Sequence, residues 1–120
     1  MLKVLKFGGS SMASAAQYAK VKAIVEADPA RRVVVVSAAG KRSKEDHKVT
    51  DLLYLCHAHM KYGVSCDSVF AMIAKRYQEI REELGLHTDL DGELERIRAA
   101  MDQGMSEDAQ ASRGNTTPPC

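Results

Sequence analysis

The spacing of apolar side chains divides the chain into a strand, a helix, a second strand and then three helices. Residues 2–7 form a short apolar-rich run, and residues 33–36 are four consecutive valines. A continuous β-branched run is typical of a strand that is buried on both faces. Residues 12–27 are rich in alanine and carry one apolar stripe, which predicts a helix between the strands. Residues 2–37 are therefore expected to form a right-handed crossover unit with parallel strands.

The second half of the chain has the periodicity of amphipathic helices. The first of these helices is predicted to begin at Thr50 or Asp51 and to end at Gly63, and the second ends at Gly85. The third covers about residues 89–103, where apolar side chains recur at intervals of three and four.

The C-terminal stretch differs from the rest of the chain in its side chains. Residues 102–120 include no Val, Ile, Leu, Phe or Tyr. A segment without these side chains cannot bury an apolar face, so we predict that it is disordered. We place the end of the folded part at residue 101 and interpret residues 102–120 as a tail.

Charge and hydropathy exclude several classes of partner. The chain has 120 residues, with 17 Lys and Arg against 16 Asp and Glu, which leaves a formal net charge of +1. This balance argues against a nucleic-acid binder and against a polybasic membrane-surface protein. No apolar run approaches the ~20 residues that span a bilayer. The first residues also lack the apolar region of a signal peptide, so we expect a cytoplasmic protein.

The cysteines and histidines do not indicate a disulfide framework or a metal site. The chain has three cysteines, Cys56, Cys66 and Cys120, and an odd number without a signal peptide argues against a disulfide scaffold. Cys56 falls in a helical pattern and is interpreted as a small buried hydrophobe. His57 and His59 neighbour it in sequence, but a helix directs these two positions to different sides.

The first of two glycine turns follows the first predicted strand, where ligands bind in open α/β sheets. Gly8 and Gly9 let the backbone approach an anion without a Cβ in the way. Ser10 or Ser11 can cap the next helix, whose unpaired N–H groups attract negative charge. Lys6 adds a positive charge, so the arrangement suits a polyphosphate. The alternative is a tight strand-to-helix turn beside a solvated lysine.

The second turn begins at Ser37, which can hydrogen-bond a ligand. The turn is not a Walker A loop, because Val35 stands where that motif needs glycine and Arg42 where it needs Ser or Thr. The basic segment 41–48 that follows can attract an anionic substrate, but we interpret it as a solvated surface loop. Thr50 is either an N-cap or a hydroxyl that contacts the substrate.

Three motifs together resemble the start of aspartate kinases in the amino-acid kinase family. They are Lys-Phe-Gly-Gly-Ser-Ser at 6–11, the valine run with Ser-Ala-Ala-Gly at 33–40, and Val-Thr-Asp-Leu-Leu at 49–53. The likeness extends over about residues 1–114. It implies a three-layer α/β/α amino-acid kinase fold, of which this chain has the N-terminal portion only: a parallel strand–helix–strand start followed by three helices.

The resemblance implies transfer of the ATP γ-phosphoryl group to the side-chain carboxylate of L-aspartate. This reaction would be the first step from aspartate in the biosynthesis of lysine, threonine and methionine. ATP would be the co-substrate, Mg²⁺ would be bound through ATP, and the parent enzyme would be a homo-oligomer. A carboxylate is already ionised near neutral pH, so the reaction needs positioning and charge neutralisation rather than a general base. The phosphate-binding residues of the family match Lys6, Gly8 and Gly9, with Ser10 beside them, and Lys6 would also be catalytic. The residues of the family that contact aspartate match Ser37 and Thr50.

The resemblance stops near the C-terminus. The family continues with a Ser-Arg/His-Gly-Glu motif, whose glutamate takes part in the aspartate site. Here the first three positions match at 112–114, but Asn115 stands where the glutamate belongs and carries no charge. The resemblance does not extend to the adenine-binding half or to the regulatory ACT domains of the family. We therefore expect a truncated or frameshifted reading frame and an isolated chain with little or no kinase activity.

Two other interpretations remain open from the sequence. The chain can be a non-catalytic module that retains a pocket for an anion or a nucleotide. It can also belong to a kinase that acts on a different small acid, although the Phe-Gly-Gly-Ser-Ser and Val-Thr-Asp-Leu-Leu segments argue against that substrate change.

Overall fold

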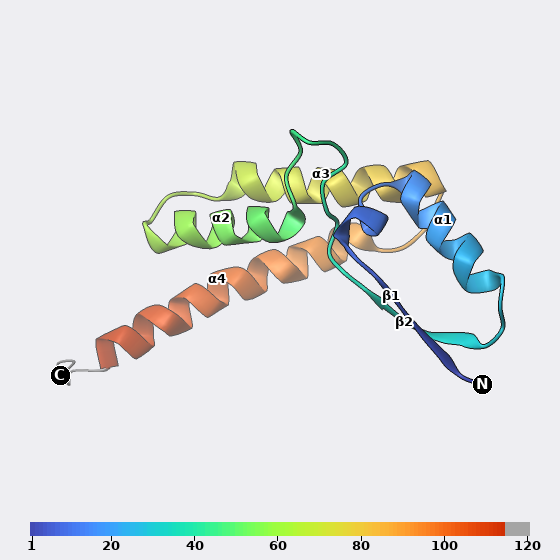
Figure 1. Cartoon of the computed structure of the whole chain (residues 1–120). Helices are drawn as coiled ribbons and strands as arrows, with labels where there is room; N and C mark the ends of the chain where they lie inside the picture. The colour runs from blue at the N-terminus through green and yellow to red at the C-terminus, as the bar shows by residue number, and fades with distance from the viewer. Residues whose placement is uncertain (115–120) are drawn as a thin grey trace.

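The computed structural model describes the backbone of residues 1–114 and the side chains of residues 1–104. Two parallel strands, joined through a helix, are followed by three helices (Figure 1). This order confirms the predicted strand–helix–strand start and the three helices after it. The elements are β1 (Lys3–Phe7), the 3₁₀ turn η1 (Gly9–Met12), α1 (Ala15–Glu26), β2 (Arg31–Val36), α2 (Val49–Lys61), α3 (Asp67–Leu84) and α4 (Leu90–Gly114).

The valines of β2 are exposed, although the sequence predicts a strand buried on both faces. Val34 is 37% exposed and Val36 is 54% exposed. The two-stranded sheet consists of β1 and β2, and α1 packs against β2. Burial of a valine run requires a covering layer on each face and further strands beside it. The described part of the chain does not supply enough of these elements, and the prediction of burial is wrong for this chain.

The apolar core lies between α2, α3 and the turn after β2. Cys56 and Cys66 are fully buried in this core, which confirms the interpretation of Cys56 as a small buried hydrophobe. Burial and the neighbouring Cys66 raise the pKa of the Cys56 thiol to about 11. The buried cluster consists of Ala39, Val49, Leu52, Cys56, Cys66, Val69 and Ile73.

Local chemistry explains the C-terminal ends of α2 and α3 and the start of α1, although the serine that caps α1 is not the predicted one. Gly63 and Gly85 have φ values of 72° and 66°, the left-handed conformation that favours glycine at helix C-termini. The N-cap of α1 is Ser14, whose Oγ accepts a hydrogen bond from the amide of Gln17. Neither Ser10 nor Ser11 caps this helix, because both belong to η1, a turn that was not predicted from the sequence.

Helix α4 continues to Gly114, beyond the predicted helix end near residue 103. The structure therefore differs from the predicted disorder over residues 102–114. The absence of large apolar side chains limits packing against a core, but Ala, Gln, Glu and Met residues still favour a helical backbone. Asn115 and Cys120 lie outside the described residues. The boundary of the domain at residue 101 stays a prediction.

The chain is less compact than a self-contained domain of its length. Its radius of gyration is 18.3 Å, whereas a compact domain of this size has about 14 Å. One cause is visible in Figure 1, where the C-terminal part of α4 extends away from the other helices. No helix in the described part is both long enough and apolar enough to cross a membrane.

Candidate functional site

The parallel pairing of β1 and β2 brings the turns that follow them to the same edge of the sheet. The amide of Ser37 donates a hydrogen bond of 3.2 Å to the carbonyl oxygen of Phe7, and the amide of Gly40 donates one of 2.8 Å to Gly9. A Cβ placed on Gly40 would lie 2.5 Å from the carbonyl carbon of Gly9 and 2.8 Å from the nitrogen of Ser10. The two turns therefore touch through their main chains, and residue 40 must be glycine for this contact.

A cavity of about 440 Å³ opens beside this contact. It brings together four of the residues that were predicted from the sequence to belong to the site, namely Gly9, Ser10, Ser37 and Thr50. No acidic side chain lines it, so an anion would meet hydroxyl groups, backbone and lysines. The full lining is Gly9, Ser10, Ser37, Ala38, Ala39, Gly40, Lys41, Lys48 and Thr50.

Two described residues that were assigned to the site from the sequence do not line this cavity. Lys6 lies in β1 opposite Val35 of β2, with an exposed side chain, and does not line the cavity. Gly8 also lies outside the lining, and a Cβ placed there would meet no atom within 4 Å. Asn115 lies outside the described residues. Binding of phosphate by Lys6 and Gly8 stays a prediction.

Thr50 lies in the first turn of α2 with an exposed side chain. The N-cap of this helix is Lys48, so the interpretation of Thr50 as an N-cap is wrong. The amide of Val49 donates a hydrogen bond of 2.9 Å to the carbonyl oxygen of Ala39, which attaches the start of α2 to the turn after β2. This attachment places Thr50 in the same cavity wall as Ser37.

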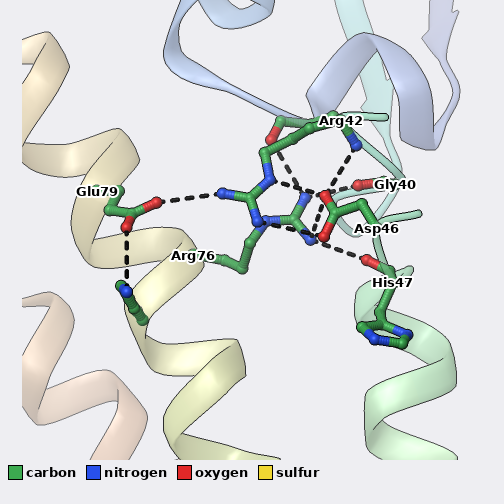
Figure 2. Close-up of polar contacts among 8 residues, drawn as sticks. Gly40, Arg42, Asp46, His47, Arg76 and Glu79 are labelled. Atoms are coloured by element: carbon green, nitrogen blue, oxygen red, sulfur yellow. Dashed lines mark hydrogen bonds and ion pairs between the residues drawn. The ribbon is translucent and has the colours of Figure 1, made fainter. Parts of the chain in front are cut away.

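Arg76 of α3 holds the segments around the cavity together and was missed from the sequence. Its side chain is buried, with 5% exposure. It donates hydrogen bonds of 2.6 Å to the carbonyl oxygen of Gly40 and 2.9 Å to that of His47 (Figure 2). A third hydrogen bond, of 3.2 Å, goes to the carbonyl oxygen of Ala13. One side chain therefore connects the segment after η1, the turn after β2 and the end of the following loop.

The sequence contains a signal for this role. Arg76 lies three residues after Ile73 and four before Ile80, so it falls on the buried stripe of α3 rather than on its polar face. An arginine at such a position must find acceptors inside the protein. The next residue, Tyr77, contributes as well, because its hydroxyl accepts a hydrogen bond of 3.1 Å from the amide of Ala39.

Asp46 lies between two arginines and anchors the loop between β2 and α2. Its Oδ2 is 2.7 Å from Nε of Arg42 and 3.5 Å from Nη1 of Arg76. Hydrogen bonds from Arg42 hold the pKa of the Asp46 carboxyl well below its usual range, although partial burial acts in the opposite direction. Arg42 also donates to Glu79 of α3 at 3.2 Å (Figure 2). These contacts fix the loop, which we expected to be only a solvated surface segment, against α3.

Within the described residues, no group of three or more His, Cys, Asp or Glu side chains is placed to hold a metal ion. The cavity lining contains no carboxylate either. A metal ion at this cavity would therefore need ligands from a bound molecule or from another part of the protein.

Comparisons with known proteins agree with the resemblance drawn from the motifs. No protein-family model matches the chain. The chain is 47% identical over 97 residues to Aspartokinase 3 of Bacillus subtilis (strain 168), an alignment that covers 81% of this chain and 21% of that protein. Its fold matches the crystal structure of the Clostridium acetobutylicum aspartate kinase with a TM-score of 0.82 and 48% identity, over 92% of this chain and 26% of that one. The chain thus spans about a fifth to a quarter of the length of these relatives.

Proposed function

We propose that this chain, which is an aspartate kinase fragment in its sequence and its fold, contributes the edge of the kinase site where phosphate and carboxylate meet. The whole enzyme would transfer the γ-phosphoryl group of ATP to the side-chain carboxylate of L-aspartate. The observation that carries the proposal is the contact of Gly9 with Gly40 beside a cavity lined by the hydroxyls of Ser10, Ser37 and Thr50. This arrangement provides hydrogen-bond donors and no acidic side chain.

The proposed reaction needs little covalent chemistry from the protein. A carboxylate oxygen attacks the γ-phosphorus, the new acyl phosphate bond forms, and the bond to the bridging oxygen breaks as ADP leaves. The attacking group is already ionised near neutral pH, so the protein has only to position the reactants and neutralise charge. Hydroxyls and backbone N–H groups at a preorganised edge perform both tasks.

Lys6 and Gly8 are proposed to bind the phosphate chain from the strand side of the cavity. Their match to the family motif and the exposed side chain of Lys6 support this role. Mg²⁺, held by the ATP phosphates, would add further charge neutralisation. The absence of a carboxylate from the cavity lining fits a magnesium ion that is bound by the nucleotide rather than by these residues.

The isolated chain is expected to have little or no kinase activity, because it spans 21% of the length of the curated relative. We place the parent enzyme in the cytoplasm, as a homo-oligomer that acts in the biosynthesis of lysine, threonine and methionine.

A chimera tests the proposal. The segment of this chain that aligns with Bacillus subtilis Aspartokinase 3 replaces its counterpart in that protein, and ADP release is measured with ATP, Mg²⁺ and L-aspartate. We expect turnover that depends on aspartate and is abolished by Lys6→Ala, and no turnover from the isolated chain. A folded but inactive chimera would contradict the proposal. Binding of ATP or aspartate by the isolated chain, combined with an inactive chimera, would favour the non-catalytic module.

A further inference from the structure

We infer that Lys41 and Lys48 form a two-lysine anion site in the wall of the cavity, and that this site binds an oxyanion group of the substrates. Both lysines line the cavity together with Ser37 and Thr50. The inference deepens the proposed function and rests on it, because the oxyanion is either a phosphate of the nucleotide or a carboxylate of the amino acid. It also assigns a role to the basic segment that the sequence left as a surface loop.

The placement of the two lysines follows from the contacts of Arg76. Its guanidinium binds the carbonyl oxygens of Gly40 and His47 at 2.6 Å and 2.9 Å (Figure 2). These two residues immediately precede Lys41 and Lys48 in the chain. One planar group therefore holds the two ends of the loop close together, and the lysines that follow its two contacts enter the same cavity wall. Arg76 is thus a positioning residue for the pair.

The charges of the loop are distributed so that the cavity is positive. Asp46, the partly buried acid of this loop, is paired with Arg42 and Arg76 and does not line the cavity. Neither Lys41 nor Lys48 forms an ion pair with any residue whose side chain the structure describes. The two arginines pair with Asp46, and Glu45, the other acid of the loop, does not line the cavity, so two ammonium groups remain for a ligand.

The remaining lining complements an oxyanion. Each ammonium group offers three hydrogen-bond donors, and the hydroxyls of Ser10, Ser37 and Thr50 add three more groups that can donate. Hydrogen bonds between a charged donor and a charged acceptor are the stronger class. A cavity with donors on several sides and no acid is therefore selective for anions over cations and neutral molecules.

Titration of the purified chain tests the inference. The amide signals of Gly9 and Gly40 are followed by NMR, with inorganic pyrophosphate in one arm and L-aspartate in the other. The variants are Lys41→Gln combined with Lys48→Gln, and Lys44→Gln as the matched control. Lys44 carries the same charge in the same loop but does not line the cavity. Thermal unfolding of each variant verifies that these substitutions of exposed lysines leave the fold intact.

We expect the wild-type chain to bind at least one of the two probes, and the double variant to bind it about tenfold more weakly. The control variant should keep the wild-type affinity, and the arm that responds identifies phosphate or carboxylate as the ligand group. The inference is overturned if neither probe shifts the glycine signals, if the double variant binds as well as the wild type, or if Lys44→Gln weakens binding equally. An active chimera together with any of these results would leave the proposed function standing, so the two failures can be distinguished.

Discussion

The amide of Gly40 donates a 2.8 Å hydrogen bond to the carbonyl oxygen of Gly9, so the turns after the two strands meet backbone to backbone. This contact decides where the cavity forms, because Gly9 and Gly40 both line it. Any side chain at residue 40 would have to enter the main chain of the neighbouring turn.

Gly40→Ala is expected to destabilise the chain, since its Cβ would lie 2.5 Å from the carbonyl carbon of Gly9. Overpacking of this kind costs about 1–3 kcal/mol. Gly8→Ala is the control, because a Cβ there meets nothing within 4 Å and φ is −77°. Urea unfolding followed by circular dichroism measures both. Equal stability of the two variants would show that the turns can separate without cost.

Arg76→Met is expected to lower the free energy of unfolding by about 3 kcal/mol, because buried carbonyl oxygens lose their donor and the side-chain packing is retained. The matched control is Arg81→Met on the same helix. Arg81 pairs at 3.4 Å with Asp91, whose side chain is 62% exposed, and such surface pairs contribute about 0–1 kcal/mol. A thermal melt that drops equally for both variants would contradict the bridging role of Arg76.

The lowered pKa of the Asp46 carboxyl is expected to make the stability of the chain depend on pH. Its pKa is lower in the folded protein than the ordinary value of 3.8, mainly because Arg42 donates hydrogen bonds to it. The stabilisation is therefore complete above the ordinary pKa and is lost as the pH falls toward the lower folded-state pKa.

A comparison of the wild type with Asp46→Asn isolates the contribution of the Asp46 carboxylate to stability. The difference in melting temperature is expected to be constant above about pH 5 and to shrink as the pH falls below about 4. Asp91→Asn serves as the exposed comparison and should show a much smaller difference. A wild-type advantage that persists undiminished in acid would show that the Asp46 carboxylate does not stabilise the fold.

The exposed valines of β2 predict self-association of the isolated chain. Val35 and Val36 are 48% and 54% exposed on a short two-stranded sheet, and an unpaired apolar edge invites pairing with another chain. Val36→Lys is expected to reduce the apparent mass in light scattering at high concentration while the far-ultraviolet circular dichroism is unchanged. A wild-type chain that stays monomeric at every concentration would contradict this expectation.

The parts of the fold that depend on near neighbours were predictable. The alternation of strand, helix and strand follows from apolar spacing, and the helix ends at Gly63 and Gly85 follow from the left-handed conformation that glycine adopts readily. The grouping of Gly9, Ser10 and Ser37 was also expected, because parallel strands bring their C-terminal turns to one edge. Thr50 was added to this group only by the resemblance to aspartate kinases.

Other features could not be derived in this way. The bridge from Arg76 joins residues that are 29, 36 and 63 positions away in the chain. Lys6 belongs to the first motif but lies outside the cavity lining. The valine run is exposed because the described part of the chain does not supply enough covering layers and neighbouring strands around the sheet.

The amino-acid sequence was sufficient to indicate the order of elements, the two glycine turns and the kinase-type motifs, because each of these is a property of a few adjacent residues. The three-dimensional fold decided which polar groups share a cavity, that Arg76 closes the loop before α2, and that Lys41 and Lys48 face the same space. The physical reason is that these outcomes depend on hydrogen bonds and packing between segments that are distant in the sequence. The local pattern of apolar and polar residues does not determine which distant segments come into contact.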